Sequence, residues 1–269
     1  MSRTVLVTGG HGFVGRHLAV HFDGWDIVAP TSRDLDVRDR DAVLAMVRDR
    51  RPTAIVHLAY RTNEADTIVD GSRNLALGAA EVGARLVHAS TDVVFGGRPD
   101  PYVETDPLDP LHAYGAAKAE AEHEVSALCP SAVMIRLSLV YGTRNLAAIQ
   151  HDVAAAVAGR STMRFFDDEY RNPVHADDAA RSIGALLGRL ADRSGPLHLA
   201  GPRTLSRAEL ARLFARHQGL DPGAVPTASA VALGLATRRP LQVALDSSLA
   251  RSLGLTARDP EEWLTPPTS

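Results

Sequence analysis

The sequence predicts an α/β protein in which a doubly wound parallel sheet is followed by a small C-terminal lobe. Short apolar runs of β-forming residues alternate with longer runs in helical spacing through the first half of the chain, which is typical of parallel sheets. The first such run, Val5–Val7, leads directly into the glycine-rich stretch Thr8–Gly15. After Tyr141-Gly142 the alternation weakens, which indicates a smaller unit of different construction.

The first half of the chain supplies most of the predicted sheet. Expected strands cover residues 4–8, 26–29, 53–58, 84–89 and 132–137, with 35–37 as a further short strand. Expected helices cover residues 13–22, 39–50, 68–82 and 112–128, where apolar residues recur every three or four positions. Because ligands of such sheets bind at the carboxyl ends of the strands, the residues that follow each strand are the first candidates for a site.

The second half combines a return to the sheet with less regular segments. We expect helices over 147–158, 176–190 and 246–253, and strands over 163–166 and 197–199. Ser206 and Glu209 have the spacing of a capping box, which predicts a helix that runs to about His217. Residues 218–245 are rich in Pro, Gly and Ala and show weak periodicity.

Composition indicates a globular protein with a small-molecule ligand. The chain has 269 residues, of which 45% are hydrophobic and 23% charged, and its formal net charge is -3. This balance argues against a nucleic-acid partner or an anionic membrane surface. The absence of a long apolar run predicts no membrane span, and a first strand that begins by residue 3 leaves no room for a signal peptide, so we expect a cytoplasmic protein. The histidines lack metal-ligand spacing, which predicts no metal site.

The glycine-rich stretch predicts a dinucleotide-binding turn between the first strand and the first helix. Its glycines fit two spacings: G-x-G-x-x-G through Gly10, Gly12 and Gly15, or G-x-x-G-x-x-G through Gly9, Gly12 and Gly15. Glycine lets the backbone turn sharply and approach a ligand closely. The helix start at Phe13 and Val14 would then present free N–H groups to a pyrophosphate.

The end of the second expected strand decides between nicotinamide cofactors. An acidic residue there would bind the 2′-hydroxyl of NAD, whereas Arg accommodates the 2′-phosphate of NADP. Here Ser32 and Arg33 come first and can donate to a phosphate, which favours NADP(H) and leaves NAD(H) open. Asp36 and Val37 are expected beside the adenine.

A second stretch predicts an acid–base site. Tyr114 and Lys118 are four residues apart on an expected helix and therefore share one face. An ammonium group beside a phenol favours the phenolate, so we expect Lys118 to lower the pKa of Tyr114. A hydroxyl at the end of the strand before that helix, Thr91 or Ser90, could bind a substrate oxygen, so the three groups would form a proton-delivery site beside a hydride donor.

These motifs together resemble those of the extended short-chain dehydrogenase/reductase superfamily, the NAD-dependent epimerase/dehydratase type. The stretches that carry the resemblance are Thr8–Gly15, His57-Leu58-Ala59, Tyr114-x-x-x-Lys118, Arg136–Gly142, Arg171–Asp178 and Arg239-Pro240 with Leu245-Asp246. The resemblance selects Gly9, Gly12 and Gly15 as the glycine register, puts Leu58 and Ala59 near the nicotinamide ribose, and makes Thr91, Tyr114 and Lys118 the catalytic triad. It further implies an NADP-binding Rossmann domain over residues 1–141 and about 172–200, and a substrate-binding lobe over about 142–171 and 201–269.

Within the superfamily, Ser90–Gly96 and Glu104–Leu108 are most similar to the dTDP-4-dehydrorhamnose reductases. Asp92 is followed by Val93, whereas the related dehydratases carry Glu there, and this difference disfavours dehydration. Leu139 stands where the reductases typically carry Trp, and Arg171 and Val174 stand where they have Gly and Thr. These differences fall on the substrate side of the expected cleft.

The sequence therefore predicts an NADP(H)-dependent oxidoreductase that reduces the carbonyl of a 4-keto sugar nucleotide or another small ketone. Two alternatives stay open: a sugar nucleotide epimerase with tightly bound NAD, and a non-catalytic NADP-binding regulatory subunit. The oligomeric state is open, with a homodimer as one candidate. The substrate-contacting candidates, for each of which a packing role is the alternative, are Tyr60, Asp92, Val93, Arg171 and Asn172.

Overall fold

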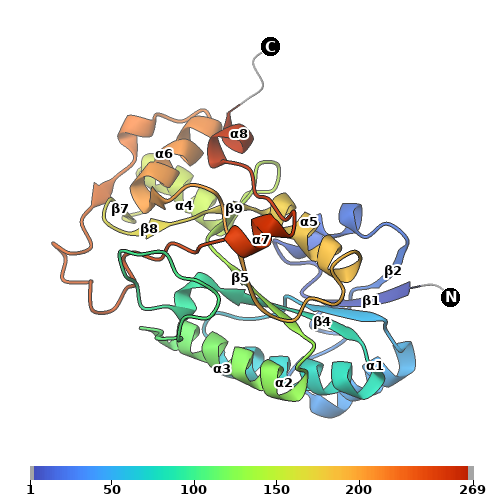
Figure 1. The fold of residues 1–269 in the computed structure, drawn as a ribbon. Helices are drawn as coiled ribbons and strands as arrows, with labels where there is room; N and C mark the ends of the chain where they lie inside the picture. The colour runs from blue at the N-terminus through green and yellow to red at the C-terminus, as the bar shows by residue number, and fades with distance from the viewer. Residues whose placement is uncertain (1–2, 266–269) are drawn as a thin grey trace.

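A six-stranded parallel sheet forms the centre of the computed structural model, which describes residues 3–265 (Figure 1). Its strands are β1 (Arg3–Thr8), β2 (Trp25–Val28), β3 (Ala54–His57), β4 (Arg85–Thr91), β5 (Val133–Leu137) and β10 (Gly195–Leu199). They lie in the order β10-β5-β4-β3-β1-β2 and all pair in parallel. The predicted doubly wound sheet is confirmed. Its strand order reverses at β1, and ligands of such sheets bind at this point.

Alternation along the strands builds one apolar layer on each face of the sheet. On one face, Leu6, Ile55 and Leu86 pack against the helices α1 (Arg40–Arg50), α2 (Ala65–Val82) and α3 (Ala113–Leu128). On the other face, Val5 and Val87 pack against α5 (Ala176–Leu187), α7 (Ser248–Ser252) and two short 3₁₀ turns. Figure 1 shows α1, α2 and α3 together on one side and α5 and α7 on the opposite side. Period-two alternation thus buries both faces.

The remaining elements of the second half form a smaller unit with an apolar cluster of its own, although Val174 packs in the layer between α5 and the sheet. Its helices are α4 (Ala148–Val157), α6 (Arg207–His217) and α8 (Pro260–Leu264), and its two-residue strands are β6 (Val140–Tyr141), β7 (Phe165–Phe166), β8 (Tyr170–Arg171), β9 (Val174–His175), β11 (Leu205–Ser206) and β12 (Thr227–Ala228). A short 3₁₀ turn, η4, covers Pro222–Ala224. Tyr141, Phe165 and Phe214 are the large buried side chains of this cluster. The predicted capping box is present, because Glu209 N donates to Ser206 Oγ and Ser206 N donates to the Glu209 carboxylate.

Two element predictions from the first half were wrong. Residues 13–22 form two 3₁₀ turns, η1 (Gly15–His17) and η2 (Ala19–His21), whose hydrogen bonds join residues three apart. Apolar spacing over so short a segment does not distinguish this bonding from that of an α-helix. Residues 35–37 are not a strand: Leu35 and Val37 are buried as the alternation suggests, but the chain here crosses from edge strand β2 to α1 and has no strand partner among the described residues.

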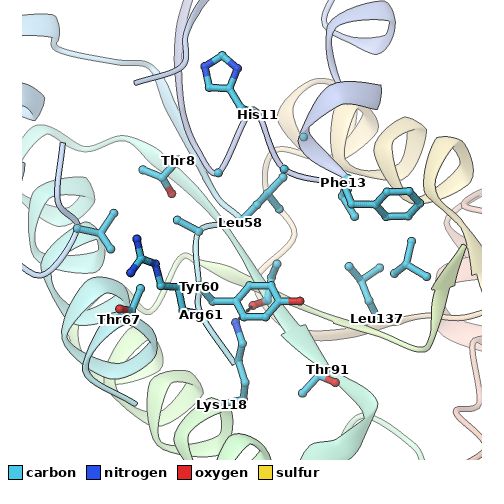
Figure 2. Close-up of a pocket in the computed structure, with 18 of the residues that line it drawn as sticks. Thr8, His11, Phe13, Leu58, Tyr60, Arg61, Thr67, Thr91, Lys118 and Leu137 are labelled. Carbon is cyan, nitrogen blue, oxygen red and sulfur yellow. Dashed lines mark hydrogen bonds between the residues drawn. The ribbon is translucent and has the colours of Figure 1, made fainter. Parts of the chain in front are cut away.

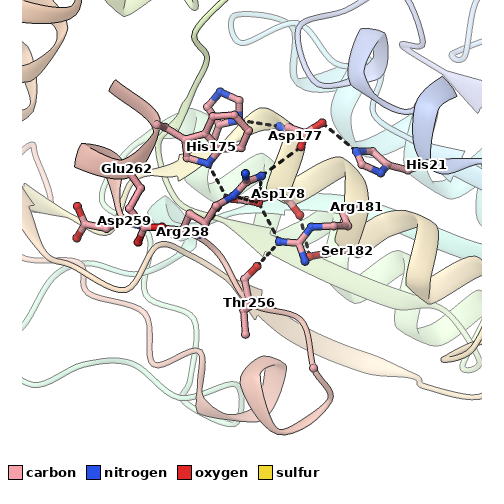
Figure 3. Close-up of polar contacts among 12 residues, drawn as sticks. His21, His175, Asp177, Asp178, Arg181, Ser182, Thr256, Arg258, Asp259 and Glu262 are labelled. Carbon is pink, nitrogen blue, oxygen red and sulfur yellow. Dashed lines mark hydrogen bonds and ion pairs between the residues drawn. The ribbon is translucent and has the colours of Figure 1, made fainter. Parts of the chain in front are cut away.

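Polar contacts at the start of α5 attach the end of the described chain to the sheet (Figure 3). The buried carboxylate of Asp178 accepts hydrogen bonds from Arg258, Arg181 and Trp263. Asp177 binds His21 of η2, with 2.9 Å between Asp177 Oδ1 and His21 Nε2. These bonds account for both acids without a metal ion. None of the helices within residues 3–265 is long and apolar enough to cross a bilayer.

Candidate active site

The glycine turn follows β1 and presses against the end of β3. The carbonyl oxygen of Gly9 accepts a hydrogen bond from Gly12 N at 2.9 Å, and a Cβ atom on Gly15 would lie only 2.4 Å from that oxygen. Gly9 itself has φ +72°, and a Cβ there would lie 2.7 Å from Ala59 N. The glycines at these positions are therefore required by close backbone packing as well as by the left-handed conformation of Gly9.

One cavity of about 870 Å³ extends along the carboxyl ends of β1, β3, β4 and β5. Figure 2 shows Arg61 and Thr67 toward one end, Thr91 and Leu137 toward the other, and the glycine loop with His11 and Phe13 along one side. The predicted cofactor and catalytic residues that line it are Gly9, Gly12, Phe13, Val14, Gly15, Ser32, Asp36, Val37, Leu58, Ala59, Thr91, Tyr114 and Lys118. The sheet thus brings together residues from five separate sequence segments.

Thr91, Tyr114 and Lys118 meet at the end of the cavity beside β4. Thr91 is the last residue of β4; its hydroxyl donates to Asp92 Oδ1 at 3.2 Å and accepts from Val93 N at 3.4 Å, at the start of a 3₁₀ turn, η3 (Asp92–Val94). Tyr114 and Lys118 come from successive turns of α3, which begins after His112 accepts a hydrogen bond from Gly115 N at 3.0 Å.

Lys118 is buried and is held by polar contacts on two sides. Its Nζ donates to Ala89 O at 2.9 Å and lies 4.7 Å from the centroid of the Tyr60 ring. Burial lowers the pKa of Lys118 to about 8, and the Glu122 carboxylate opposes this shift. A buried ammonium with so low a pKa is a feature of functional sites.

The prediction for the Tyr114 pKa was wrong in sign. The pKa of Tyr114 is raised, first by burial of the half-buried phenol and then by the neighbouring Tyr60, while the Thr91 hydroxyl acts in the opposite direction. Desolvation disfavours the phenolate, and this effect exceeds the stabilisation that we expected from Lys118 one helical turn away. The consequence is a phenol that keeps its proton at neutral pH.

The opposite end of the cavity is lined by exposed charged pairs. Arg38 binds Asp36 with both arms of its guanidinium, at 2.7 Å between Nη2 and Oδ2 and 3.0 Å between Nε and Oδ1, and it lies 3.7 Å from Glu64. Arg61 donates to Glu64 at 3.0 Å. Hydrogen bonds from Arg38 lower the pKa of Asp36 to about 2.

Arg33, which the sequence placed at this end, does not line the cavity. Its side chain is exposed, and its backbone N–H donates to Thr31 Oγ1. Thr31 in turn binds the carboxylate of Asp34, and this local turn orders the loop after β2. Arg38 lines the cavity instead. Its sequence position, ten residues after the end of β2, did not indicate this.

The candidate substrate residues divide into two groups. Tyr60 and Asp92 line the cavity, whereas Val93, Arg171 and Asn172 do not. Arg171 is buried, with its Nε 3.5 Å from Asp92 Oδ2 and its Nη2 3.4 Å from Glu169. It therefore stands behind the wall that Asp92 forms.

The other two candidates outside the cavity have packing contacts. Asn172 Oδ1 accepts from Leu245 N at 3.0 Å, and its Nδ2 donates to Thr204 at 3.1 Å. The backbone oxygen of Val93 lies so close to Gly115 that a Cβ there would come within 2.3 Å of it. Both residues thus support the packing around the cavity and do not form its surface.

Sequence reasoning put only Leu139 of one cavity wall on the substrate side and missed the rest of that wall. This wall consists of Leu137, Ser138, Leu139, Val140, Ala147, Ala148 and Ile149. Leu137 ends β5 and the next three residues follow it, so the rule that ligands bind at strand ends would have included all four. The last three begin α4, and no sequence signal places that helix start opposite the glycine turn. Among the described residues, no cluster of three or more His, Cys, Asp or Glu side chains has the arrangement of a metal site.

Comparisons with known proteins show which family the chain is similar to. Residues 3–265 match the family model described as the RmlD substrate binding domain. The chain is 34% identical to the dTDP-4-keto-6-deoxy-D-glucose reductase of Streptomyces niveus, over 93% of this chain and 91% of that protein. It is 30% identical to the methionine adenosyltransferase 2 subunit beta of Pongo abelii, over 96% of this chain and 85% of that protein.

A solved structure extends the similarity to the whole fold. The dTDP-4-dehydrorhamnose reductase of Bacillus anthracis str. Ames, determined in complex with NADP, superimposes with a TM-score of 0.87 at 27% identity, and the match covers 98% of each chain. The chain therefore belongs to the RmlD substrate binding domain family, within the extended short-chain dehydrogenase/reductase superfamily that its motifs resemble.

Proposed function

We propose that the chain is an NADP(H)-dependent reductase that converts the keto group of a 4-keto-6-deoxy sugar nucleotide to an alcohol. The observation that carries the proposal is the single cavity in which the glycine turn and the groups Thr91, Tyr114 and Lys118 face a common space. Relatives named as reductases of such sugar nucleotides support the substrate class.

Three side chains of the site would divide the work of ketone reduction. A bound NADPH would supply the hydride that the carbonyl carbon accepts. Tyr114 donates its phenolic proton to the carbonyl oxygen, so that hydride and proton together complete the alcohol. Burial keeps this phenol protonated before the reaction. The Thr91 hydroxyl would orient the oxygen, and the Lys118 ammonium would stabilise the phenolate that Tyr114 becomes.

The remainder of the cavity fits a dinucleotide. The close-packed glycine turn leaves the backbone at Gly12 and Phe13 accessible to a pyrophosphate, as such turns do when they open a helical segment. At the far end, Ser32 and Arg38 are donors that would hold a 2′-phosphate, while the Asp36 carboxylate is an acceptor for a free 2′-hydroxyl. We assign the NADP preference to Arg38 in place of Arg33.

The second half of the chain would hold the sugar nucleotide. Residues 1–141 and about 172–200 form the proposed cofactor-binding part, and about 142–171 and 201–269 the proposed substrate lobe. Tyr60 and Asp92 face the cavity, and Arg171 would act indirectly by fixing the Asp92 carboxylate. Burial raises the pKa of Asp92, although Arg171 and Ser138 oppose the shift.

The test is turnover of dTDP-4-keto-6-deoxyglucose, followed by loss of NADPH absorbance. Tyr114→Phe removes the proton donor and should lower kcat by ~10²-fold or more while NADPH binding stays intact. Full kcat in this variant would refute the assigned role. Absence of NADPH consumption, with NAD retained on the purified protein, would favour an epimerase.

A regulatory role is the second candidate, because the methionine adenosyltransferase 2 subunit beta is a relative at similar identity. A protein with that role would bind NADP, show no turnover with any keto sugar nucleotide, and co-purify with a larger enzyme. The presence of Thr91, Tyr114 and Lys118 in the cavity favours catalysis.

A further inference from the structure

A row of buried polar side chains crosses the sheet beneath the candidate active site. Two ladders of neighbouring residues form it: Thr8, His57 and His88 on β1, β3 and β4, and Ser90, Arg136 and His198 on β4, β5 and β10. All six side chains are buried. Strand alternation directs them to the face that α2 and α3 cover, since Leu6, Ile55 and Leu86 on the same strands pack there. Polar groups in such a layer are costly unless paired.

Glu122 extends from α3 into this layer, where it binds one residue of β4 and one residue of β5. Its carboxylate accepts a hydrogen bond from Ser90 Oγ and is held by Arg136, at 2.8 Å from Nη2 and 3.1 Å from Nε. Arg136 also donates to Glu104 O at 3.1 Å and to His198 Nε2 at 3.3 Å. Glu122 and Arg136 are each 4% exposed. A buried ion pair of this kind adds little net stability, because the desolvation of the two charges offsets their attraction.

The place of Glu122 on α3 connects the ion pair to the reaction. Tyr114, Lys118 and Glu122 are spaced by four residues and therefore lie on one face of the helix. Ser90, which Glu122 holds, lines the cavity beside Thr91. Glu122 thus contacts β4, the strand that ends in Thr91. It also lies one helical turn after Lys118, which faces the same cavity.

The charges around Lys118 give Glu122 a specific electrostatic role. His57 and His88 face Lys118 from β3 and β4, and burial lowers the pKa of His57 to about 3 and that of His88 well below its usual value, so both are neutral. Tyr60 presents the face of its ring. Glu122 is therefore the carboxylate that opposes the desolvation of the Lys118 ammonium.

We propose that Glu122, clamped by Arg136 and Ser90, is a positioning residue: its carboxylate keeps Lys118 in the charged form and fixes the face of α3 that presents Tyr114 and Lys118 to the cavity. The inference rests on the proposed reductase function, in which the Lys118 ammonium stabilises the Tyr114 phenolate. Because burial keeps the Tyr114 phenol protonated to high pH, we expect activity to fall above about pH 8 as Lys118 loses its proton.

The test compares the pH profiles of kcat for the wild type, Glu122→Gln and a control. Removal of the carboxylate charge should move the alkaline limb down by roughly one pH unit, which at pH 8 is a further loss of about fivefold. Glu120→Gln, on the exposed side of the same helix, makes the same charge change and should leave the limb in place. Glu122→Asp keeps the charge and should leave the alkaline limb close to its wild-type position. A merely structural role would lower kcat at every pH without moving the limb.

The outcomes separate this inference from the function on which it rests. A wild type that binds NADPH and reduces no keto sugar nucleotide would refute the reductase function itself. An active wild type whose alkaline limb coincides with that of Glu122→Gln would overturn the role of Glu122. If Glu122→Gln does not fold, the double variant Glu122→Met with Arg136→Met removes both charges of the pair, which buried ion pairs often tolerate, and it must show the same downward shift.

Discussion

Replacement of Arg258 by Ala should destabilise the protein far more than its half-exposed position suggests. The Arg258 side chain donates to Asp178 Oδ1 from Nη2 at 2.9 Å and from Nε at 3.2 Å, and its guanidinium carbon lies 3.6 Å from the centroid of the Trp263 ring (Figure 3). Asp178 is 1% exposed. The substitution therefore leaves a buried carboxylate with only part of its donors.

The magnitude follows from what Arg258→Ala removes and what stays. Asp178 keeps Arg181 at 2.8 Å, Trp263 Nε1 at 2.9 Å and the backbone N–H of residue 258 at 3.0 Å. Loss of one charged partner costs about 2 kcal/mol, and loss of the cation–ring contact about 0.5–1 kcal/mol. At ~2–4 °C per kcal/mol for a chain of this size, Tm should fall by roughly 5–10 °C.

Thermal unfolding followed by circular dichroism tests this estimate against a matched arginine. Arg251 forms an exposed pair with Asp246 at 3.7 Å, so Arg251→Ala should change the free energy of unfolding by less than about 1 kcal/mol. Burial alone would raise the pKa of Asp178, but hydrogen bonds from Arg258, Trp263 and Arg181 outweigh it and lower that pKa. The stabilisation is thus present above the ordinary carboxyl value and is lost as pH falls through the lowered pKa. Equal Tm values for the two variants at neutral pH would refute the reasoning.

Three further substitutions test the two ends of the proposed dinucleotide site. Gly15→Ala puts a Cβ 2.4 Å from the Gly9 carbonyl oxygen, so the turn must shift, and NADPH affinity measured by fluorescence titration should fall by ~10²-fold or more; an unchanged Kd would show that the turn does not hold the cofactor. Arg38→Ala should raise the KM for NADPH by ~10-fold or more and leave that for NADH nearly unchanged, whereas Arg33→Ala should alter neither. If Arg33→Ala raised the KM for NADPH more than Arg38→Ala did, Arg33 would be the residue that binds the 2′-phosphate.

The sheet was predictable because its signals are local. Apolar β-forming runs marked β1, β3, β4 and β5 to within about two residues at each end, and the strand-end rule then brought the glycine turn and Thr91 to one edge. The helical spacing of Tyr114 and Lys118 sufficed to put both side chains in one cavity. The alternating spacing of residues 35–37 predicted a strand, but spacing alone does not show whether a neighbouring strand is available for pairing.

The errors in the site arise where the outcome depends on groups distant in sequence. Tyr114 was expected to titrate low because Lys118 is near, but the desolvation that prevails comes from packing that no local pattern reveals. Arg38, not Arg33, reaches the cavity because the loop after β2 is turned by the bonds of Thr31 to Asp34. A sequence lists the candidate charges, but the fold decides which of them face the ligand.

The two ends of the cavity differ in construction, and this difference has a functional consequence. At the proposed adenosine end, Asp36 and Arg38 pair with side chains that are 45% and 47% exposed, so each charge is solvated and can exchange partners at small cost. At the other end, Lys118 and Glu122 are almost fully buried, where loss of one charge leaves its neighbour uncompensated. Cofactor preference should therefore be altered by single substitutions at the exposed end, while substitutions at the buried end should affect the reaction itself. Electrostatic stabilisation of a transition state requires this kind of fixed, water-excluded site, whereas selection between two cofactors does not.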